Sequence, residues 1–403
     1  MRRSNKMATE ISFLRMISFC IVSFVIASLA DIVPTADSHP SSTWSTTYHD
    51  RSRSSHIIKR GLYRRGGSNG TGIGNLSASH EEQINGTNAT STSVLSSLTG
   101  GHPLLYSTCS VQGERQYMED EYFVEQGRFA AVYDGHGGAT VSRYLRQNLY
   151  ASFQAALPTS ASMVINTSDN DKTLDLKSTV IKNDAQSTIV ASALRAAFDK
   201  VDSEVCRIGH WSFQGSTALA VVIHENIDNG TRSIVSANVG DSRAVLSRNG
   251  IAIDLTKDHK PNDGTERERI ESLGGTVDWC GAVDSQGEPL EHTGVYRING
   301  NLALSRAIGD RSERPWVTNA VDIAHHPIEE GKDSFVLLAT DGLFDVMTSQ
   351  EVVTFVNEMI DNTPPEDRQE IQRDIAKHVV EEALIRGSND NITVLVLWIN
   401  EES

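Results

Sequence analysis

Runs of apolar residues, broken by turn-forming residues, occupy the middle and the end of this chain and predict buried strands. One run, Phe129–Tyr133, stops at Asp134, and another, Phe335–Thr340, stops at Asp341. The remaining runs are Thr217–Ile223, Ser233–Val239, Arg243–Leu246 and Ile392–Ile399. Because short turns separate several of these runs, the strands are expected to pair as antiparallel hairpins.

Segments with apolar residues at every third or fourth position predict helices around these strands. The predicted helices are Ala139–Leu157, Ile189–Arg207, Gln350–Met359 and Asp367–Ile385, with a short helix at Thr265–Leu273 that is capped by Thr265. The strands cluster in the middle of the chain and most of their junctions are hairpin-like. This order favours an α+β fold, with packed antiparallel sheets flanked by helices, over a doubly wound parallel sheet.

Two polar segments interrupt this pattern. Residues 158–188 are polar and poor in aromatic residues, and we interpret them as a surface insertion. Residues 278–296 show no clear period and are expected to form a flexible loop. The folded part, residues 101–401, is therefore predicted to carry one insertion and one extended loop.

The N-terminal residues 1–30 have the pattern of a secretory signal peptide. Arg2, Arg3 and Lys6 precede an apolar run from Met16 to Ala30. A membrane span needs roughly 20 apolar residues, so an uncleaved signal anchor requires the run to extend back past Arg15. This reading places the protein in the secretory pathway, secreted or membrane-anchored. A mitochondrial presequence and a cytoplasmic protein are the alternatives.

Composition separates residues 31–100 from the rest of the chain. This segment is rich in Ser, Thr, Gly and Asn, and such a sequence buries too little apolar surface to fold, so we predict a disordered linker. Residues 101–403 carry 26 Lys and Arg against 46 Asp and Glu. So acidic a region argues against nucleic-acid binding and suits cations, although a solvated acidic surface is the simpler alternative. Three cysteines follow the apolar run, with no CxxC pair, which is typical of a domain that folds reduced.

Acidic residues recur where apolar runs end. Each Asp-Gly or Asn-Asp pair is by itself more often a turn than a ligand, but buried carboxylates are costly unless they are paired or bind a cation. Clustered carboxylates without Cys or His sets indicate Mg²⁺ or Mn²⁺ rather than zinc. The acids concerned are Glu119, Asp120, Asp134, Asp241, Asp341, Asp345 and Asp390.

Two basic side chains beside these acids suggest phosphate chemistry. An Arg such as Arg115 can hold a phosphate with two hydrogen bonds. A His such as His136 can protonate a leaving alkoxide, although a lone His is usually structural. Two metal ions that share a carboxylate could activate a water and bind a phosphoryl oxygen. No P-loop and no HExxH motif occurs in the sequence.

These motifs resemble those of the metal-dependent protein serine/threonine phosphatases of type 2C. The resemblance covers about 300 residues in the order of that family. It implies a four-layer αββα fold, with two central antiparallel sheets and helices outside. The matching stretches are 115–120, 132–138, 215–218, 238–243, 255–261, 266–270, 302–310, 339–345 and 388–391.

Carried over residue by residue, the resemblance implies two Mg²⁺ or Mn²⁺ ions and a third, weaker site. Arg115 would bind the substrate phosphate, His136 would be the general acid, and Asp120 would orient metal-bound water. The implied metal ligands are Asp134, Asp341 and Asp390 for one ion, Asp134, the Gly135 carbonyl and Glu119 for the other, and Asp241 and Asp345 for the weaker site. None of these positions is substituted, which argues against an inactive relative.

The resemblance therefore implies an enzyme of signal transduction that dephosphorylates phosphoserine and phosphothreonine in protein substrates. The alternatives are a catalytically silent phosphoprotein-binding module and a structural cation-binding domain, in which Arg115 and His136 would be idle. Segment 278–296 corresponds to the flap beside the active site in the family and is longer here, so substrate choice stays open. We expect a monomer with no nucleic-acid partner.

Overall fold

The structure, a computed structural model, describes residues 103–158, 177–226, 230–290 and 293–399. All described residues belong to one compact unit, which lies within Gln83–Ser403. The predicted signal segment 1–30 and linker 31–100 lie outside the described residues. None of the helices within the described ranges is both long enough and apolar enough to cross a membrane.

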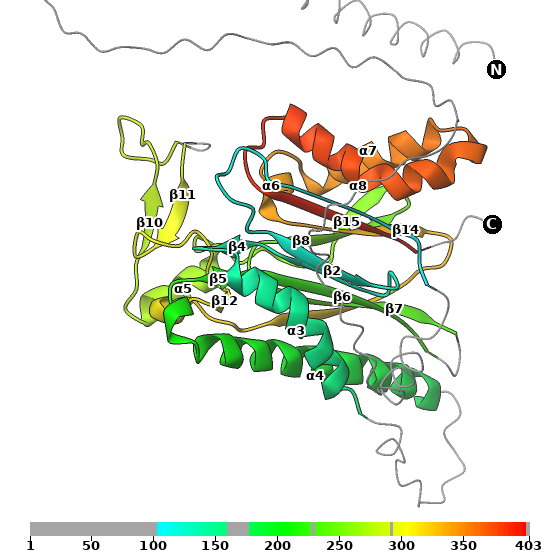
Figure 1. The fold of residues 1–403 in the computed structure, drawn as a ribbon, viewed down its shortest axis with the longest axis horizontal. Coiled ribbons are helices and arrows are strands. Elements are labelled where there is room, and N and C mark those ends of the chain that lie inside the picture. The colour runs from blue at the N-terminus through cyan, green and yellow to red at the C-terminus, as the bar shows by residue number, and fades with distance from the viewer. Residues whose placement is uncertain (1–102, 159–176, 227–229, 291–292, 400–403) are drawn as a thin grey trace, which may run out of the picture. The chain divides into compact units, whose positions relative to one another are not determined.

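Two five-stranded sheets, antiparallel throughout, lie face to face at the centre of this unit (Figure 1). The first has the strand order β1 (Tyr106–Val111), β15 (Ile392–Trp398), β14 (Asp333–Ala339), β8 (Arg243–Arg248) and β9 (Ile251–Asp254). The second has the order β13 (Asp322–Pro327), β7 (Arg232–Val239), β6 (Ala218–Glu225), β3 (Phe129–Tyr133) and β2 (Glu121–Glu125).

Helices cover the outer face of each sheet, which completes four layers (Figure 1). Helices α7 (Ser349–Asp361) and α8 (Arg368–Ile385) contact the first sheet. Helices α3 (Thr140–Ala156) and α4 (Lys177–Cys206) contact the second. The predicted α+β sandwich of two antiparallel sheets flanked by helices is therefore confirmed.

Side-chain alternation along the strands divides the interior into three apolar layers. In β3, Phe129 and Tyr133 pack with α3 and α4, whereas Ala130 and Val132 face the other sheet. A third layer lies between the first sheet and helices α7 and α8. Strand β15 is buried along its whole length, as its largely apolar sequence predicted, because both of its faces are covered.

Small elements occupy the end of the sandwich where β3 and β14 stop. A three-stranded sheet has the order β12 (Ile308–Gly309), β5 (Gly215–Ser216) and β4 (Gly135–His136). A separate hairpin pairs β10 (Val277–Cys280) with β11 (Val295–Ile298). The short helices of the described residues are α5 (Gly264–Ser272), α6 (Asp341–Phe344), η1 (Gly209–Trp211), η2 (Arg311–Glu313) and η3 (Pro365–Asp367), of which η3 lies between α7 and α8 in the chain and contacts α8.

The predicted insertion 158–188 is wrong at its C-terminal end. Helix α4 begins at Lys177, whereas the sequence pattern placed the helix start at Ile189. Ser187 is buried, and its hydroxyl lies 3.2 Å from Nε2 of His224 and 2.9 Å from Nε2 of His325. These contacts with β6 and β13 hold a polar turn of helix α4 against the sheet. The spacing of apolar residues in the sequence does not indicate such contacts. Residues 159–176 lie outside the described ranges.

Two further local predictions need correction. The ends of segment 278–296 form strands β10 and β11, and the rings of Trp279 and Tyr296 pack edge to face across the hairpin with centroids 5.1 Å apart. Helix α5 is capped by Asp263 and not by Thr265, since the Asp263 carboxylate accepts a hydrogen bond from the Thr265 N–H.

Candidate functional site

The two acids that end apolar runs come from different sheets and meet at one end of the sandwich. Asp134 follows β3 of the second sheet, and Asp341 opens α6 directly after β14 of the first. Asp134 is held by Thr217, because its backbone N–H donates to the Thr217 hydroxyl over 2.9 Å. The charge of Asp341 raises the pKa of Asp134, so the two carboxylates lie within electrostatic reach of each other.

The other predicted acids gather around this pair and form what we call the acid cluster. Asp241 lies in the turn between β7 and β8, Asp390 precedes β15, and Asp345 ends α6. Their carboxylates all act electrostatically on Asp341. The acid cluster consists of Glu119, Asp120, Asp134, Asp241, Asp341, Asp345 and Asp390.

Burial and mutual repulsion disfavour the charged state of this cluster. Burial, and then the charge of Asp241, raise the pKa of Asp341 to about 8. Burial raises the pKa of Asp120 to about 7, although hydrogen bonds from the hydroxyls of Thr393 and Thr340 oppose the change. The pKa of Asp134 lies well above its ordinary range for the same reasons, burial first and then the charge of Asp120. The site therefore binds positive charge favourably.

Among the described residues, two cationic side chains form ion pairs with the cluster. The Lys260 ammonium lies 2.5 Å from an Asp241 carboxylate oxygen and 3.7 Å from one of Asp341. Burial alone would lower the pKa of Lys260, but the charges of Asp241 and Asp341 raise it. The Arg115 guanidinium lies 2.5 Å from Asp390, and its side chain is 60% exposed, so it can also reach a ligand. These ion pairs reach Asp241, Asp341 and Asp390, and the other four carboxylates of the cluster have no ion pair among the described residues.

The residues of the cluster fit a hard divalent cation. Their donor atoms are all oxygens, which is the set that Mg²⁺ and Mn²⁺ prefer. Oδ1 of Asp120 is buried and finds no hydrogen-bond partner among the described residues. Within the same residues, no group of three or more His, Cys, Asp or Glu side chains is already arranged as a metal cage. Mg²⁺ usually keeps several waters among its ligands, so it does not require a complete protein cage.

Strand β4 carries Gly135 and His136 beside the cluster. A side chain at Gly135 would clash, because a Cβ atom there would lie 2.6 Å from the Glu119 carbonyl oxygen and 2.7 Å from the Ser142 hydroxyl. His136 is largely buried, and its Nε2 lies 2.6 Å from a carboxylate oxygen of Asp310. Burial alone would lower the pKa of His136, but the hydrogen bond and the charge of Asp310 raise it.

The structure brings all the predicted site residues to one end of the sandwich. It also places beside them residues to which the sequence analysis assigned no role. Lys260 and Asp310 both lie inside motif stretches quoted above, but nothing local indicates what they contact. Asn391 links the segments, since its Oδ1 accepts from the Glu119 N–H over 2.8 Å and its Nδ2 donates to the Tyr117 carbonyl over 3.1 Å. Only the pairing of distant strands reveals these contacts.

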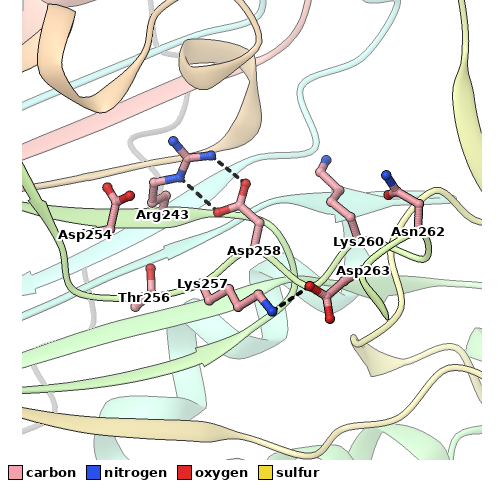
Figure 2. Close-up of a pocket in the computed structure, with 8 residues that line it drawn as sticks. All are labelled: Arg243, Asp254, Thr256, Lys257, Asp258, Lys260, Asn262 and Asp263. Atoms are coloured by element: carbon pink, nitrogen blue, oxygen red, sulfur yellow. Dashed lines mark hydrogen bonds and ion pairs between the residues drawn. The ribbon is translucent and has the colours of Figure 1, made fainter. Parts of the chain in front are cut away.

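A cavity of about 540 Å³ opens beside Lys260 (Figure 2). Its charged groups are largely paired: Arg243 binds both oxygens of Asp258, over 3.0 and 2.7 Å, and Lys257 lies 2.5 Å from Asp263. The cavity therefore lacks the uncompensated charge that marks the acid cluster. It is lined by Arg243, Asp254, Thr256, Lys257, Asp258, Lys260, Asn262 and Asp263.

Comparison with known proteins identifies relatives over the same residues. The family model described as "Protein phosphatase 2C" matches residues 104–392. The chain is 32% identical over 306 residues to "Probable protein phosphatase 2C 59" of Oryza sativa subsp. japonica, covering 74% of this chain and 76% of that protein. It is 34% identical over 307 residues to "Probable protein phosphatase 2C 69" of Arabidopsis thaliana, covering 74% and 70%.

Solved structures share the fold at lower sequence identity. One described as "Structure of a C.elegans sex determining protein" has a TM-score of 0.58 at 24% identity, covering 74% of this chain and 66% of that one. The "Crystal structure of serine-threonine phosphatase 2C from Toxoplasma gondii" has a TM-score of 0.55 at 21% identity, covering 75% and 96%. At these identities the likeness concerns the fold alone.

Proposed function

The chain belongs to the protein phosphatase 2C family and is a serine/threonine protein phosphatase, and from this premise we propose that its acid cluster works with divalent cations. The observation that carries this proposal is the set of carboxylates at Asp120, which is buried, and at Asp134 and Asp341, which are half-buried; burial first and then the charges of neighbouring carboxylates raise their pKa values. Mg²⁺ or Mn²⁺ would supply the missing positive charge.

We propose two cation positions and a third, weaker one. Asp134, Asp341 and Asp390 would hold one ion. Asp134, the Gly135 carbonyl and Glu119 would hold the other, and Asp241 with Asp345 would form the weaker site. Bound ions of this kind lower the pKa of water and offset the charge of a phosphoryl group. Support comes from the all-oxygen donor set and from the unpartnered Oδ1 of Asp120.

The remaining residues have separate tasks in this proposal. Arg115, whose guanidinium is exposed, binds the phosphate of the substrate. Asp120, held by the hydroxyls of Thr340 and Thr393, orients the water that attacks phosphorus. His136 donates a proton to the serine or threonine oxygen as it leaves, a contribution worth roughly 10²–10⁴-fold in rate. The substrates are phosphorylated proteins.

Hydrolysis of a phosphothreonine peptide with and without Mn²⁺ or Mg²⁺ tests this function. We expect turnover that requires the cation, stops on addition of EDTA and is lost in Asp341→Asn. Asp361→Asn, an exposed acid at the end of α7, is the matched control and should keep wild-type turnover. Turnover that survives EDTA would contradict the proposed metal dependence. Calorimetry that shows cation binding without turnover would support the silent binding module instead.

The compartment and the assembly state are further proposals that rest on sequence alone. We propose that the N-terminal segment directs the protein to the secretory pathway, as a secreted or membrane-anchored monomer. Fractionation of a C-terminally tagged full-length protein tests the location, and recovery in a mitochondrial or cytosolic fraction would refute it. Light scattering after gel filtration measures the assembly state, and a mass above that of one chain would refute the monomer.

A further inference from the structure

The small sheet beside the acid cluster places three chain segments in register around one glycine. Gly215 of β5 pairs with His136 of β4 on one side and with Gly309 of β12 on the other. Asp310 directly follows Gly309 and is almost fully buried, with 1% of its surface exposed. The sheet thus brings a buried carboxylate and the predicted general acid to the two sides of Gly215.

The contact between these two side chains passes close over Gly215. Nε2 of His136 lies 2.6 Å from Oδ2 of Asp310. A Cβ atom at Gly215 would lie 2.1 Å from that same carboxylate oxygen and 2.5 Å from that same ring nitrogen. No residue with a side chain fits at this position unless the two groups separate. The glycine is therefore part of what allows the pair to form.

Asp310 is held in a backbone conformation that non-glycine residues rarely adopt. Its φ and ψ angles are 46° and 44°, in the left-handed region, which is unfavourable for a residue with a side chain. Its N–H donates to the Gln214 carbonyl over 2.9 Å, and its own carbonyl accepts from the Glu313 N–H over 2.9 Å. The neighbouring Gly309 N–H donates to Asp202 over 2.9 Å. These bonds hold the strained backbone that carries the carboxylate, as expected where backbone strain serves a function.

A second histidine–aspartate pair shows what a structural contact looks like in this protein. Nε2 of His259 lies 3.0 Å from Asp322, and Nδ1 of His259 accepts a hydrogen bond from the Gly240 N–H over 3.0 Å. Both ring nitrogens of His259 are therefore occupied. At His136, only Nε2 has a hydrogen-bond partner among the described residues, which leaves Nδ1 for a ligand.

We propose that Asp310 is a positioning residue for catalysis. Its carboxylate accepts the Nε2–H of His136 and fixes the ring, so that Nδ1 is the nitrogen that delivers the proton to the leaving oxygen. This inference rests on the proposed role of His136 as general acid. Beyond that role, the inference names the ring nitrogen that donates the proton, Nδ1, and the residue that orients the ring, Asp310.

The step balances as a simple hydrolysis. The oxygen of the attacking water forms a bond to phosphorus, and the bond between phosphorus and the serine or threonine oxygen breaks. That oxygen keeps the electron pair of the broken bond and takes the proton from Nδ1 of His136. The water releases one proton to solvent, and the neutral imidazole regains one from solvent. Asp310 stays a carboxylate throughout.

The test compares two leaving groups in the wild-type enzyme and in Asp310→Asn. The alkoxide of a threonine leaves only with a proton, whereas 4-nitrophenolate leaves without one. We expect Asp310→Asn to lower kcat on a phosphothreonine peptide by about 10–100-fold, a part of the general-acid contribution. With 4-nitrophenyl phosphate, kcat should fall less than about threefold, with KM unchanged for both substrates. Equal losses on both substrates, or no loss on the peptide, would overturn the proposal.

Two further variants separate this role from a structural one. In the His136→Gln background, adding Asp310→Asn should cause no further loss on the peptide, because the ring that it positions is gone; a further tenfold loss would refute the proposal. Asp322→Asn removes the partner of His259 and should show no dependence on the leaving group. If the wild-type enzyme hydrolyses neither substrate, the proposed function itself fails.

A measurement on the wild-type protein covers the case in which Asp310→Asn does not fold. Nitrogen-15 NMR of the histidine rings distinguishes the two neutral tautomers. We expect neutral His136 to carry its proton on Nε2, and the Asp310 carboxylate to be its acceptor. A proton found on Nδ1 would overturn the proposal without any variant.

Discussion

At pH 8 and without metal, replacing Asp341 by Asn is expected to stabilise the folded protein while it abolishes catalysis. Burial and the charge of Asp241 raise the pKa of Asp341 to about 8, against about 3.8 for an ordinary Asp. Between these two values the folded state binds a proton that the unfolded state lacks. Stability must therefore fall as the pH rises from about 4 through 8. Asn carries no charge and escapes this loss.

The magnitude follows from the proton affinity and from the surroundings of the side chain. Each tenfold change in proton affinity corresponds to about 1.4 kcal/mol, so the upper bound at pH 8 is roughly 5 kcal/mol. The side chain of Asp341 is 24% exposed and shares protons with its neighbours, and Lys260 loses one of its two acidic partners. A gain of about 1–3 kcal/mol is therefore expected, or roughly 2–8 °C in Tm.

Thermal unfolding in EDTA at pH 5 and pH 8 measures this gain. Asp341→Asn should melt above the wild type at pH 8 and near it at pH 5, and Mn²⁺ should stabilise only the wild type strongly. Asp333→Asn is the contrasting control, because this fully buried acid is paired with Arg248 over 2.6 and 2.9 Å. Its loss should destabilise by about 3 kcal/mol. The reasoning is refuted if Asp341→Asn melts below the wild type at pH 8, or gains equally at both pH values.

Three further substitutions test single contacts. Arg115→Lys should raise KM for a phosphothreonine peptide about tenfold, because an ammonium cannot hold phosphate through two parallel hydrogen bonds; an unchanged KM in steady-state kinetics would contradict this. Gly215→Ala should lower peptide turnover at least about tenfold, since its Cβ would displace the Asp310 carboxylate; wild-type turnover would show that the pair tolerates separation. Thr348→Ala removes the capping box with Glu351 and should cost about 1 kcal/mol in chemical denaturation, with activity retained.

The strands and most helices could be predicted because their signals are local. The apolar run Ile392–Trp398 is buried along its whole length, as expected for a central strand. Helix α3 follows the predicted helical spacing, and Val141, Leu145 and Leu149 are all buried. The sequence pattern placed the start of α4 too late because the first turns of this helix are polar. Within them, Ser187 is buried by hydrogen bonds to histidines from β6 and β13. A polar turn that is anchored by distant residues looks like a surface segment in the sequence.

By itself, the sequence determined which residue types could bind cations and phosphate. Acids that follow buried strands are removed from water, and this costs free energy unless a positive charge lies beside them. It did not determine what each of them contacts. His136 and Asp310 are 174 positions apart, and only the register of β4, β5 and β12 brings them within 2.6 Å. The reason is physical: the burial of a strand or helix shows in the pattern of apolar residues next to one another in the chain. A contact between strands depends instead on how distant segments pair. The tertiary structure alone decided that His136 has Asp310 as a partner.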